Sequence, residues 1–155
     1  MVIYKHTQIS YLMIVIVLLV FILFARAHVM SLAEPVSADS GTNFAVTTIM
    51  VLILLFLTSF TTLTVFIDEA FLRIKFGYGI FTKMFPLNQI ISVQPVKNRW
   101  YYGWGIKVWF WPYMKIYNVS GYDAVEIIMK NGKIYRIGTD NPGELATVIK
   151  QAANI

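Results

Sequence analysis

The chain has 155 residues, of which 57% are apolar and 14% charged, and it contains no cysteine. Soluble domains average about 45–50% apolar and about 25% charged residues, so this composition excludes an ordinary water-soluble globule and also a disordered chain. Without cysteine, disulfides, thiolate nucleophiles and thiolate metal sites are excluded. The net charge of +5 permits an anionic partner without identifying one.

Two long apolar stretches near the N-terminus predict a membrane anchor. They cover about residues 9–28 and 43–61. A helix needs about 20 mostly apolar residues to cross a hydrocarbon core about 30 Å thick, and both stretches meet that length. We therefore expect residues 1–61 to form a hairpin of two transmembrane helices, joined by an external loop at about residues 29–42.

The first apolar stretch has an alternative interpretation as a cleaved signal peptide. Lys5 would be its charged start, and Ala25-Arg26-Ala27 has the form of a cleavage site. The apolar run from Tyr11 is as long as the longest signal-peptide cores, and Arg26 lies inside the cleavage site. A retained transmembrane helix, with the Arg26 side chain reaching the membrane edge, is therefore the favoured interpretation.

The basic residues set the expected orientation of the hairpin. Lys5 precedes the first stretch, whereas the loop carries Glu34 and Asp39, with Arg26 only at its edge. The basic residues that follow the second stretch begin with Arg73, Lys75 and Lys83. Because Lys and Arg favour the cytoplasmic side, we expect a multi-pass protein of the cell membrane with its C-terminal domain in the cytoplasm.

From Thr62 the sequence changes to short, punctuated runs that are typical of β-strands. Leu63, Val65 and Ile67 recur at the two-residue period of a half-buried strand. The Asn131-Gly132 pair between two apolar runs predicts a hairpin with a type I′ turn. The further strand candidates are residues 71–76, 80–85, 89–96, 106–111, 115–119, 124–129 and 133–137.

The end of the chain predicts one amphipathic helix. Asn141 can cap it and Pro142 suits its first position. Its apolar stripe consists of Leu145, Val148, Ile149 and Ala152. The expected fold is a membrane α-helical hairpin followed by a mainly-β domain at residues 62–155, a partly open barrel or sandwich of about seven antiparallel strands closed by this helix.

Four short motifs are spread through the β domain: Gly103-Trp104-Gly105-Ile106, Tyr117-Asn118-Val119-Ser120-Gly121, Ala124-Val125-Glu126 and Ile137-Gly138-Thr139-Asp140. Their order and spacing resemble a prokaryotic pleckstrin-homology-like family of small, often membrane-anchored proteins. The resemblance covers about residues 62–152 and implies a seven-stranded barrel with a C-terminal helix. Phosphoinositide-binding members of the superfamily carry basic residues around the loop that joins their first two strands. Here we assign that loop to Asp68-Glu69, which would repel a phosphate, so a phosphoinositide ligand is not expected.

The sequence offers no catalytic or metal-binding constellation. If the first stretch is a helix, His6 and His28 lie about 33 Å apart, at opposite ends of it, so they cannot share a metal. Asp140 and Glu144 have an explanation at the helix start, and Glu126 has no evident partner for acid–base chemistry. We expect no enzyme, no cofactor and no metal. Because no ionisable group lies between Tyr11 and Ala25 or between Gly41 and Ile67, we also expect no ion path.

The most unusual segment is residues 97–113, where aromatic and basic residues alternate. In a single strand Trp109, Trp111 and Tyr113 would share one face, and part of this surface would be exposed. The candidate surface residues are Lys97, Arg99, Trp100, Tyr101, Trp104, Lys107, Trp109 and Trp111. Three interpretations remain open: rings packed against the C-terminal helix, a protein interface, or a surface for anionic lipid.

We expect a non-enzymatic, membrane-anchored module that mediates protein–protein interaction or self-association at the inner membrane surface. The alternative is recognition of anionic lipid by the segment 97–113. Single-stranded nucleic acid is bound by similar residues, but a tether to the membrane argues against it, so no nucleic-acid partner is expected.

Overall fold

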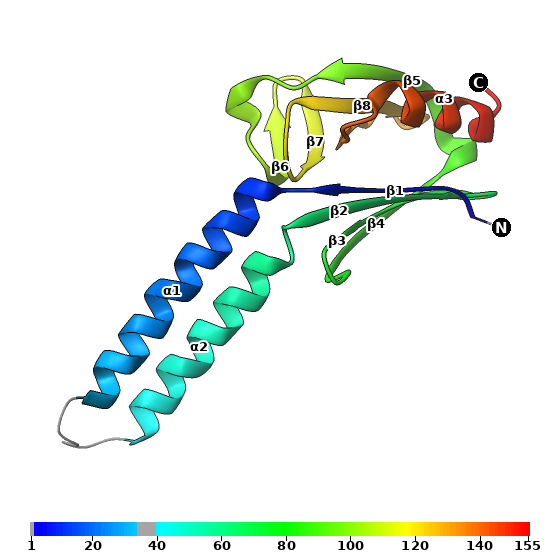
Figure 1. The fold of residues 1–155 in the computed structure, drawn as a ribbon. Coiled ribbons are helices and arrows are strands. Elements are labelled where there is room, and N and C mark those ends of the chain that lie inside the picture. Colours follow the sequence, from blue (N-terminus) through cyan, green and yellow to red (C-terminus); the bar gives the residue numbers. More distant parts are fainter. Residues whose placement is uncertain (1, 34–39) are drawn as a thin grey trace.

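The computed structural model describes residues 2–33 and 40–155 (Figure 1). Its helices are α1 (Tyr11–Ala33), α2 (Ser40–Thr58) and α3 (Pro142–Ala153), with short 3₁₀ turns η1 (Leu87–Gln89) and η2 (Trp100–Tyr102). Its strands are β1 (Val2–Ile9), β2 (Thr62–Asp68), β3 (Phe71–Phe76), β4 (Phe81–Pro86), β5 (Ile90–Lys97), β6 (Gly105–Phe110), β7 (Tyr113–Asn118), β8 (Asp123–Met129) and β9 (Ile134–Gly138).

The helices α1 and α2 lie side by side and project from the β domain as a hairpin (Figure 1). In the described part of the chain, one helix is long and apolar enough to cross a membrane, over Tyr11–Ser31, and none of its apolar window is buried. A second, shorter apolar stretch covers Phe44–Thr58. The predicted loop, about residues 29–42, is too long, because α1 extends to Ala33 and α2 begins at Ser40. Residues 34–39, including Glu34 and Asp39, lie outside the described residues.

The first residues of the chain form a strand of the β domain, although the sequence assigned them to the anchor. β1 pairs antiparallel with β2, with Ile9 opposite Thr62. Ser10 then turns the chain into α1: its backbone N–H donates to Thr61 O at 2.8 Å and its Oγ accepts from Met13 N–H at 3.3 Å. The helical hairpin is therefore inserted between two neighbouring strands of one sheet.

Two sheets make up the β domain. The first has the order β1-β2-β3-β4 and the second the order β5-β8-β9-β7-β6. The described residues thus contain nine strands instead of the predicted seven, and β7 and β9 pair in parallel instead of antiparallel. The inserted hairpin also changes the loop assignment, because Asp68-Glu69 joins β2 to β3 and is not the loop between the first two strands.

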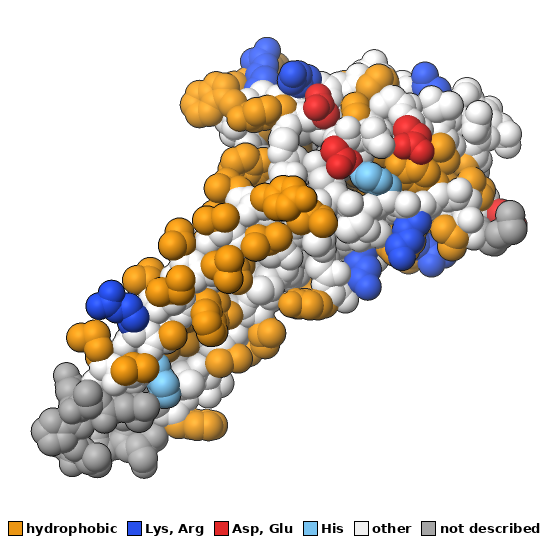
Figure 2. Space-filling view, viewed as in Figure 1, with side chains coloured by type: hydrophobic (Ala, Val, Ile, Leu, Met, Phe, Trp, Pro, Cys, Tyr) orange, Lys and Arg blue, Asp and Glu red, His pale blue; other side chains and the backbone are white. Residues whose placement is uncertain are grey.

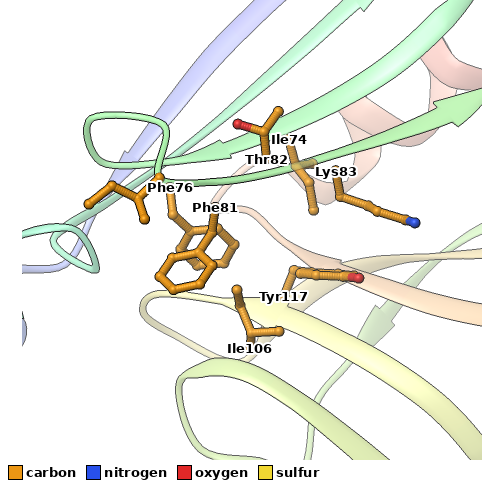
Figure 3. Close-up of a pocket in the computed structure, with 8 residues that line it drawn as sticks. Ile74, Phe76, Phe81, Thr82, Lys83, Ile106 and Tyr117 are labelled. Atoms are coloured by element: carbon orange, nitrogen blue, oxygen red, sulfur yellow. The ribbon is translucent and has the colours of Figure 1, made fainter. Parts of the chain in front are cut away.

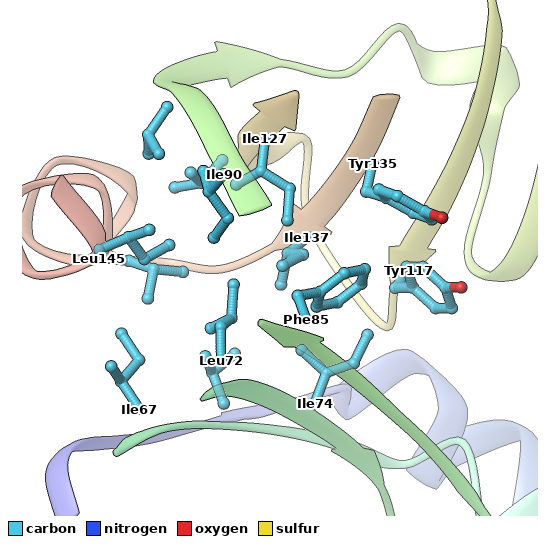
Figure 4. Packing of buried hydrophobic residues seen from close by; sticks show 14 of the residues in the cluster. Ile67, Leu72, Ile74, Phe85, Ile90, Tyr117, Ile127, Tyr135, Ile137 and Leu145 are labelled. Atoms are coloured by element: carbon cyan, nitrogen blue, oxygen red, sulfur yellow. The ribbon is translucent and has the colours of Figure 1, made fainter. Parts of the chain in front are cut away.

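The core lies between the two sheets and under α3 (Figure 4). The predicted alternation in β2 is confirmed, since Leu63, Val65 and Ile67 are buried. The Phe85 ring from the first sheet packs edge-on against Tyr135 from the second, with 4.8 Å between ring centroids. The predicted C-terminal helix is also confirmed: α3 packs against β5 and β8 with its apolar stripe, including the fully buried Leu145 and Ile149.

The β8–β9 hairpin has a different turn from the predicted one. A type I′ turn needs positive φ at both central residues, but Asn154 is the one non-glycine residue with positive φ among those described. Gly132 alone takes φ +75°, and its N–H donates to Met129 O at 2.8 Å. This is the three-residue loop in which glycine occupies the left-handed position.

Candidate interaction surfaces

Four of the predicted surface residues form one cluster on the outer face of the second sheet. η2 lies over β6, so that Tyr101 is 5.4 Å from Trp109 and 5.8 Å from Trp100 between ring centroids. Arg99 Nη1 donates to the Tyr101 hydroxyl at 2.6 Å, and this hydrogen bond raises the pKa of the Arg99 guanidinium above its ordinary value. We call Arg99, Trp100, Tyr101 and Trp109 the aromatic cluster.

A part-buried polar network lies under the aromatic cluster. Arg136 Nε donates to Glu126 Oε2 at 2.7 Å, and Gln94 Nε2 donates to Glu126 Oε1 at 2.9 Å. The Arg136 guanidinium lies over the Tyr102 ring at 5.7 Å, and Tyr102 packs against Trp109. Sequence reasoning missed the partner of Glu126, because β8 and β9 bring Glu126 and Arg136 opposite each other only through their register.

Trp111 lies beyond the cluster, at the tip of the β6–β7 hairpin. Its side chain is 91% exposed and that of Phe110 is 78% exposed, so the prediction of an exposed aromatic surface is confirmed. The prediction that Trp109, Trp111 and Tyr113 share a face is wrong, because β6 ends at Phe110 and a turn places Tyr113 opposite it. The rings pack on one another and on the second sheet, whereas α3 packs mainly elsewhere, against β5 and β8.

The strand β6 is an open edge of the second sheet. Ile106, Val108 and Phe110 share one face of it, and all three are exposed. The other edge of the same sheet, β5, is interrupted by a register shift between Ile90 and Ser92 and contains Pro95. Proline and bulges are the features by which proteins protect sheet edges from further pairing, and β6 pairs with β7 in an unbroken register.

Trp104 and Lys107 lie at the start of β6, where the β domain meets the helices; Lys107 shares a face of β6 with Trp109, but its ammonium lies over Gly103. Trp104 and Lys107 line a cavity of about 500 Å³ with residues of both helices. The Lys107 ammonium lies over Gly103, where a Cβ atom would come within 2.6 Å of Nζ. The cavity is lined by Met13, Phe56, Phe60, Gly103, Trp104, Gly105, Ile106, Lys107 and Val119.

A second cavity of about 250 Å³ opens between the two sheets beside the first (Figure 3). Phe76 and Phe81 of the first sheet and Ile106 and Tyr117 of the second form its apolar wall. Lys83 lies at its rim, on the inner side of β4 opposite Ile74. Burial, and then the neighbouring Tyr135, raise the pKa of the Tyr117 phenol.

Lys97 is the one predicted surface residue that has not yet been placed. It ends β5 and is paired in register with Asp123. The candidate residues therefore do not form one surface. They divide between the aromatic cluster, the hairpin tip, the cavity at the helix ends and the end of β5.

The motif residues behind the family resemblance have a structural role at the joint between β domain and helices. Ser120 Oγ donates to Ile9 O at 3.3 Å, and Gln8 Nε2 donates to Ser120 O at 3.1 Å. Asn118 Nδ2 closes the same turn on Gly121 O at 3.0 Å, and its side chain fills the space beside Gly138, where any Cβ would overlap it. These contacts hold the β7–β8 turn against the start of α1.

The two histidines lie apart, as predicted. His6 pairs with Asp140 at the start of α3, and His28 Nδ1 is 3.5 Å from Thr47 Oγ1 on the neighbouring helix. Within residues 2–33 and 40–155, no three His, Asp or Glu side chains are grouped as a metal site would require.

Comparison with protein families, curated proteins and solved structures finds no match to this chain.

Proposed function

We propose that this chain is a non-enzymatic, membrane-anchored module that binds another protein through the β6 edge. The apolar side chains of α1 are not buried, and α2 also exposes apolar side chains. Both observations support a hairpin of two transmembrane helices. The pairing of β1 with β2 supports a retained first helix, because cleavage after α1 would remove a strand from the sheet. The hydroxyls of Thr48 and Thr58 donate to carbonyls of their own helix, as an anchor without a polar pathway requires.

The orientation of the hairpin follows from its charges. Arg26 is the one Lys or Arg between Lys5 and Arg73, so almost all basic residues lie on the side of the β domain. The positive-inside rule then places the β domain at the cytoplasmic face of the cell membrane.

We also propose that the β domain is pleckstrin-homology-like, on the strength of its two packed sheets and C-terminal helix. In this interpretation the helical hairpin takes the place of the loop between the first two strands. The one Lys or Arg of the hairpin, Arg26, lies far along α1 from the β domain, so a phosphoinositide ligand remains outside the proposal.

The observation that carries the binding proposal is the contrast between the two edges of the second sheet. β6 offers unpaired backbone groups next to exposed Ile106, Val108 and Phe110, whereas β5 is protected by Pro95. An extended segment of a partner can add to such an edge through main-chain hydrogen bonds, with its side chains on the apolar face. The exposed Trp111 at the tip adds the kind of aromatic residue that is enriched at interfaces.

Geometry favours a different protein over a second copy at this edge. β6 begins beside the helices and runs away from them, so Trp111 lies about 20 Å along the strand from Gly105 (Figure 1). Two copies in one membrane would present their β6 strands in the same direction. Antiparallel pairing of two β6 edges would place the two helical hairpins on opposite sides, which one bilayer does not allow.

Site-specific photo-crosslinking in the native membrane tests this proposal. A photoreactive amino acid replaces Phe110 in the full chain, and the matched control replaces Ile91, which is 52% exposed on the protected β5 edge. We expect a discrete crosslinked species from position 110 that disappears with Val108→Lys and is absent from position 91. Equal crosslinking from both positions, or persistence in the Val108→Lys variant, would contradict binding at β6. A crosslinked species with twice the mass of the chain would identify self-association instead.

The position of Trp104 and Lys107 favours a second candidate function, recognition of anionic lipid. Both line the cavity at the helix ends, where Trp and Lys meet lipid headgroups in a membrane-anchored protein. Mass spectrometry of lipid co-purified with the full chain tests it: Lys107→Gln is expected to reduce retained anionic lipid, whereas Lys97→Gln, at the end of β5, is expected to leave it unchanged. Equal retention in both variants would remove this candidate.

A further inference from the structure

The outer face of the first sheet is basic. It carries Lys5 on β1 and Arg73 and Lys75 on β3, two strands that end on the side of the helices. Its carboxylate, Asp68, lies about 20 Å along β2 from Thr62, at the far end of the sheet. Figure 2 shows Lys and Arg side chains gathered on the underside of the β domain, beside the hydrophobic surface of the helical hairpin. Of the three basic residues, Lys75 lies nearest the helices, whereas Lys5 and Arg73 lie opposite Phe66, closer to Asp68 than to Thr62.

The β3–β4 turn brings exposed apolar side chains to the level of the helix ends. Gly77 N–H donates to Thr62 O at 3.0 Å, and Gly77 lies so close to Ser59, just after α2, that a Cβ atom would come within 2.5 Å of Ser59 O. In the same turn Tyr78 is 66% exposed and Ile80 is 61% exposed. This turn comes down beside the end of α2 (Figure 1).

Lys75 links the turn to the basic face. Its aliphatic stem lies over Gly79, where a Cβ atom would meet Lys75 Cε at 2.6 Å, and so its ammonium lies beside the turn. Arg73 and Lys5 are farther away, about 10 Å from Phe76 and about 13 Å from Ile9 along their strands. Since electrostatic attraction in physiological salt extends about 8 Å, Lys75 has the strongest interaction with a charged surface at the level of the turn.

The other two basic side chains are partly engaged within the sheet. Arg73 pairs with Asp68 at 2.8 Å, and the Lys5 ammonium lies 5.5 Å from the Phe66 ring centroid. Both residues are exposed. They can therefore strengthen the attraction of an anionic surface but do not position the turn.

We propose that the β3–β4 turn and the outer face of the first sheet form a second contact with the bilayer that holds the helical hairpin. Tyr78 and Ile80 enter the boundary between headgroups and acyl chains, and Lys75 binds anionic headgroups, with Arg73 and Lys5 adding long-range attraction. This inference rests on the proposed membrane anchor. It fixes the tilt of the β domain so that the first sheet faces the lipid and the β6–β7 tip points away from it.

The absence of native cysteine makes a direct test possible, because each introduced cysteine is a unique site for a spin label. The full chain is placed in nanodiscs of phosphatidylcholine with phosphatidylglycerol as the anionic lipid, and labelled at Ile80→Cys, Trp111→Cys or Leu19→Cys. Power saturation compares collisions with oxygen, which concentrates in lipid, and with a water-soluble nickel chelate. We expect the Ile80 label to be protected from nickel and accessible to oxygen, and the Trp111 label to show the reverse.

The Leu19 label separates failure of this inference from failure of the anchor. Lipid exposure at Leu19 with water exposure at Ile80 overturns the membrane contact of the turn and leaves the anchor intact. Water exposure at Leu19 overturns both. A nickel-protected but oxygen-poor Ile80 label indicates that protein covers the turn, and this also overturns the inference.

A charge variant tests the role of Lys75. In the Ile80-labelled chain, Lys75→Gln is expected to reduce the equilibrium between immersed and free turn by about fivefold in anionic nanodiscs and to have little effect in pure phosphatidylcholine. Lys130→Gln, which removes the same charge from the β8–β9 turn, is the matched control. An equal response to both variants would show that Lys75 does not bind headgroups.

Discussion

The two sheets of the β domain solve the same packing problem in different ways. Each contributes one apolar face to the shared core, but the first sheet turns a basic and polar face outward, with Lys5, Arg73 and Lys75 on it. The second sheet has apolar residues on both faces, because Met114 and Ile116 form a small cluster under Tyr102, away from the main core. A sheet with one apolar face can lie against water or headgroups, whereas a sheet with two needs a further cover. Tyr102 and Trp109 supply that cover on the outer face, whereas Ile106, Val108 and Phe110 stay exposed on the other face of β6.

The largest loss of stability is expected from a substitution in the core that the two sheets share. Phe85→Ala is expected to destabilise the domain by roughly 3–5 kcal/mol, because the ring is 1% exposed and packs between Tyr117 and Tyr135. Denaturant unfolding of the full chain in detergent, followed by Trp fluorescence, measures the change. A loss below about 1 kcal/mol would mean that the sheets do not share one core.

The outer face of the second sheet can be tested through the part-buried ion pair of Glu126 and Arg136. Arg136→Met alone leaves Glu126 unpaired and is expected to cost about 2–3 kcal/mol, less than a fully buried pair because the two side chains retain 17% and 11% exposure. The double variant Glu126→Leu with Arg136→Met is expected to recover most of that loss. A double-mutant cycle by thermal unfolding gives both values, and additive losses would contradict a direct pairing.

The contact between the first sheet and the end of α2 can be tested by comparing two glycines of positive φ, Gly77 and Gly132. Gly77→Ala places a Cβ against Ser59 O, whereas Gly132→Ala has nothing within 4 Å, so both share the backbone strain and only the first adds a clash. We expect Gly77→Ala to be less stable than Gly132→Ala by roughly 1–3 kcal/mol. Equal melting temperatures would mean that the turn does not rest on the end of α2.

The smallest expected effect is on the pH dependence of stability below about pH 4. Asp68 accepts hydrogen bonds from Ala70 and Phe71 N–H at 2.9 and 2.7 Å, and these, with Arg73, lower its pKa. A lowered pKa contributes stability that is present above the unfolded value of about 4 and is lost as pH falls through the folded pKa. The melting temperature of the native chain should therefore fall more steeply below about pH 4 than that of Asp68→Asn. Parallel curves would contradict this contribution.

The predicted β-strands and terminal helix were recoverable from sequence because burial on one face leaves a period. The strand β1 was not recoverable for the same reason: its inward positions include His6 and Gln8, so its apolar residues show no alternation. Gln8 is buried because it serves the turn at Ser120, 112 residues away along the chain. No local pattern records such a partner.

The sequence located the candidate residues within one segment of the chain but did not predict how they are grouped in space. Composition alone singled out residues 97–113, and the exposure of Trp111 agrees with that choice. The separation of Trp104 and Lys107 from Trp109 depends on where β6 lies relative to the helices. That β6 is an open edge follows from the order of the strands in the sheet. The sequence does not specify this order, because no local pattern records which strands pair.

The sequence by itself determined that the chain carries an apolar helical region followed by a β-rich domain with a terminal helix, because hydrophobic period and turn residues act over a few neighbouring positions. Only the tertiary structure decided that the helices are inserted between β1 and β2, that β7 and β9 run parallel, and that β6 is left at an edge. These are pairings between distant segments. Their free energy comes from contacts that exist only when the whole chain has folded.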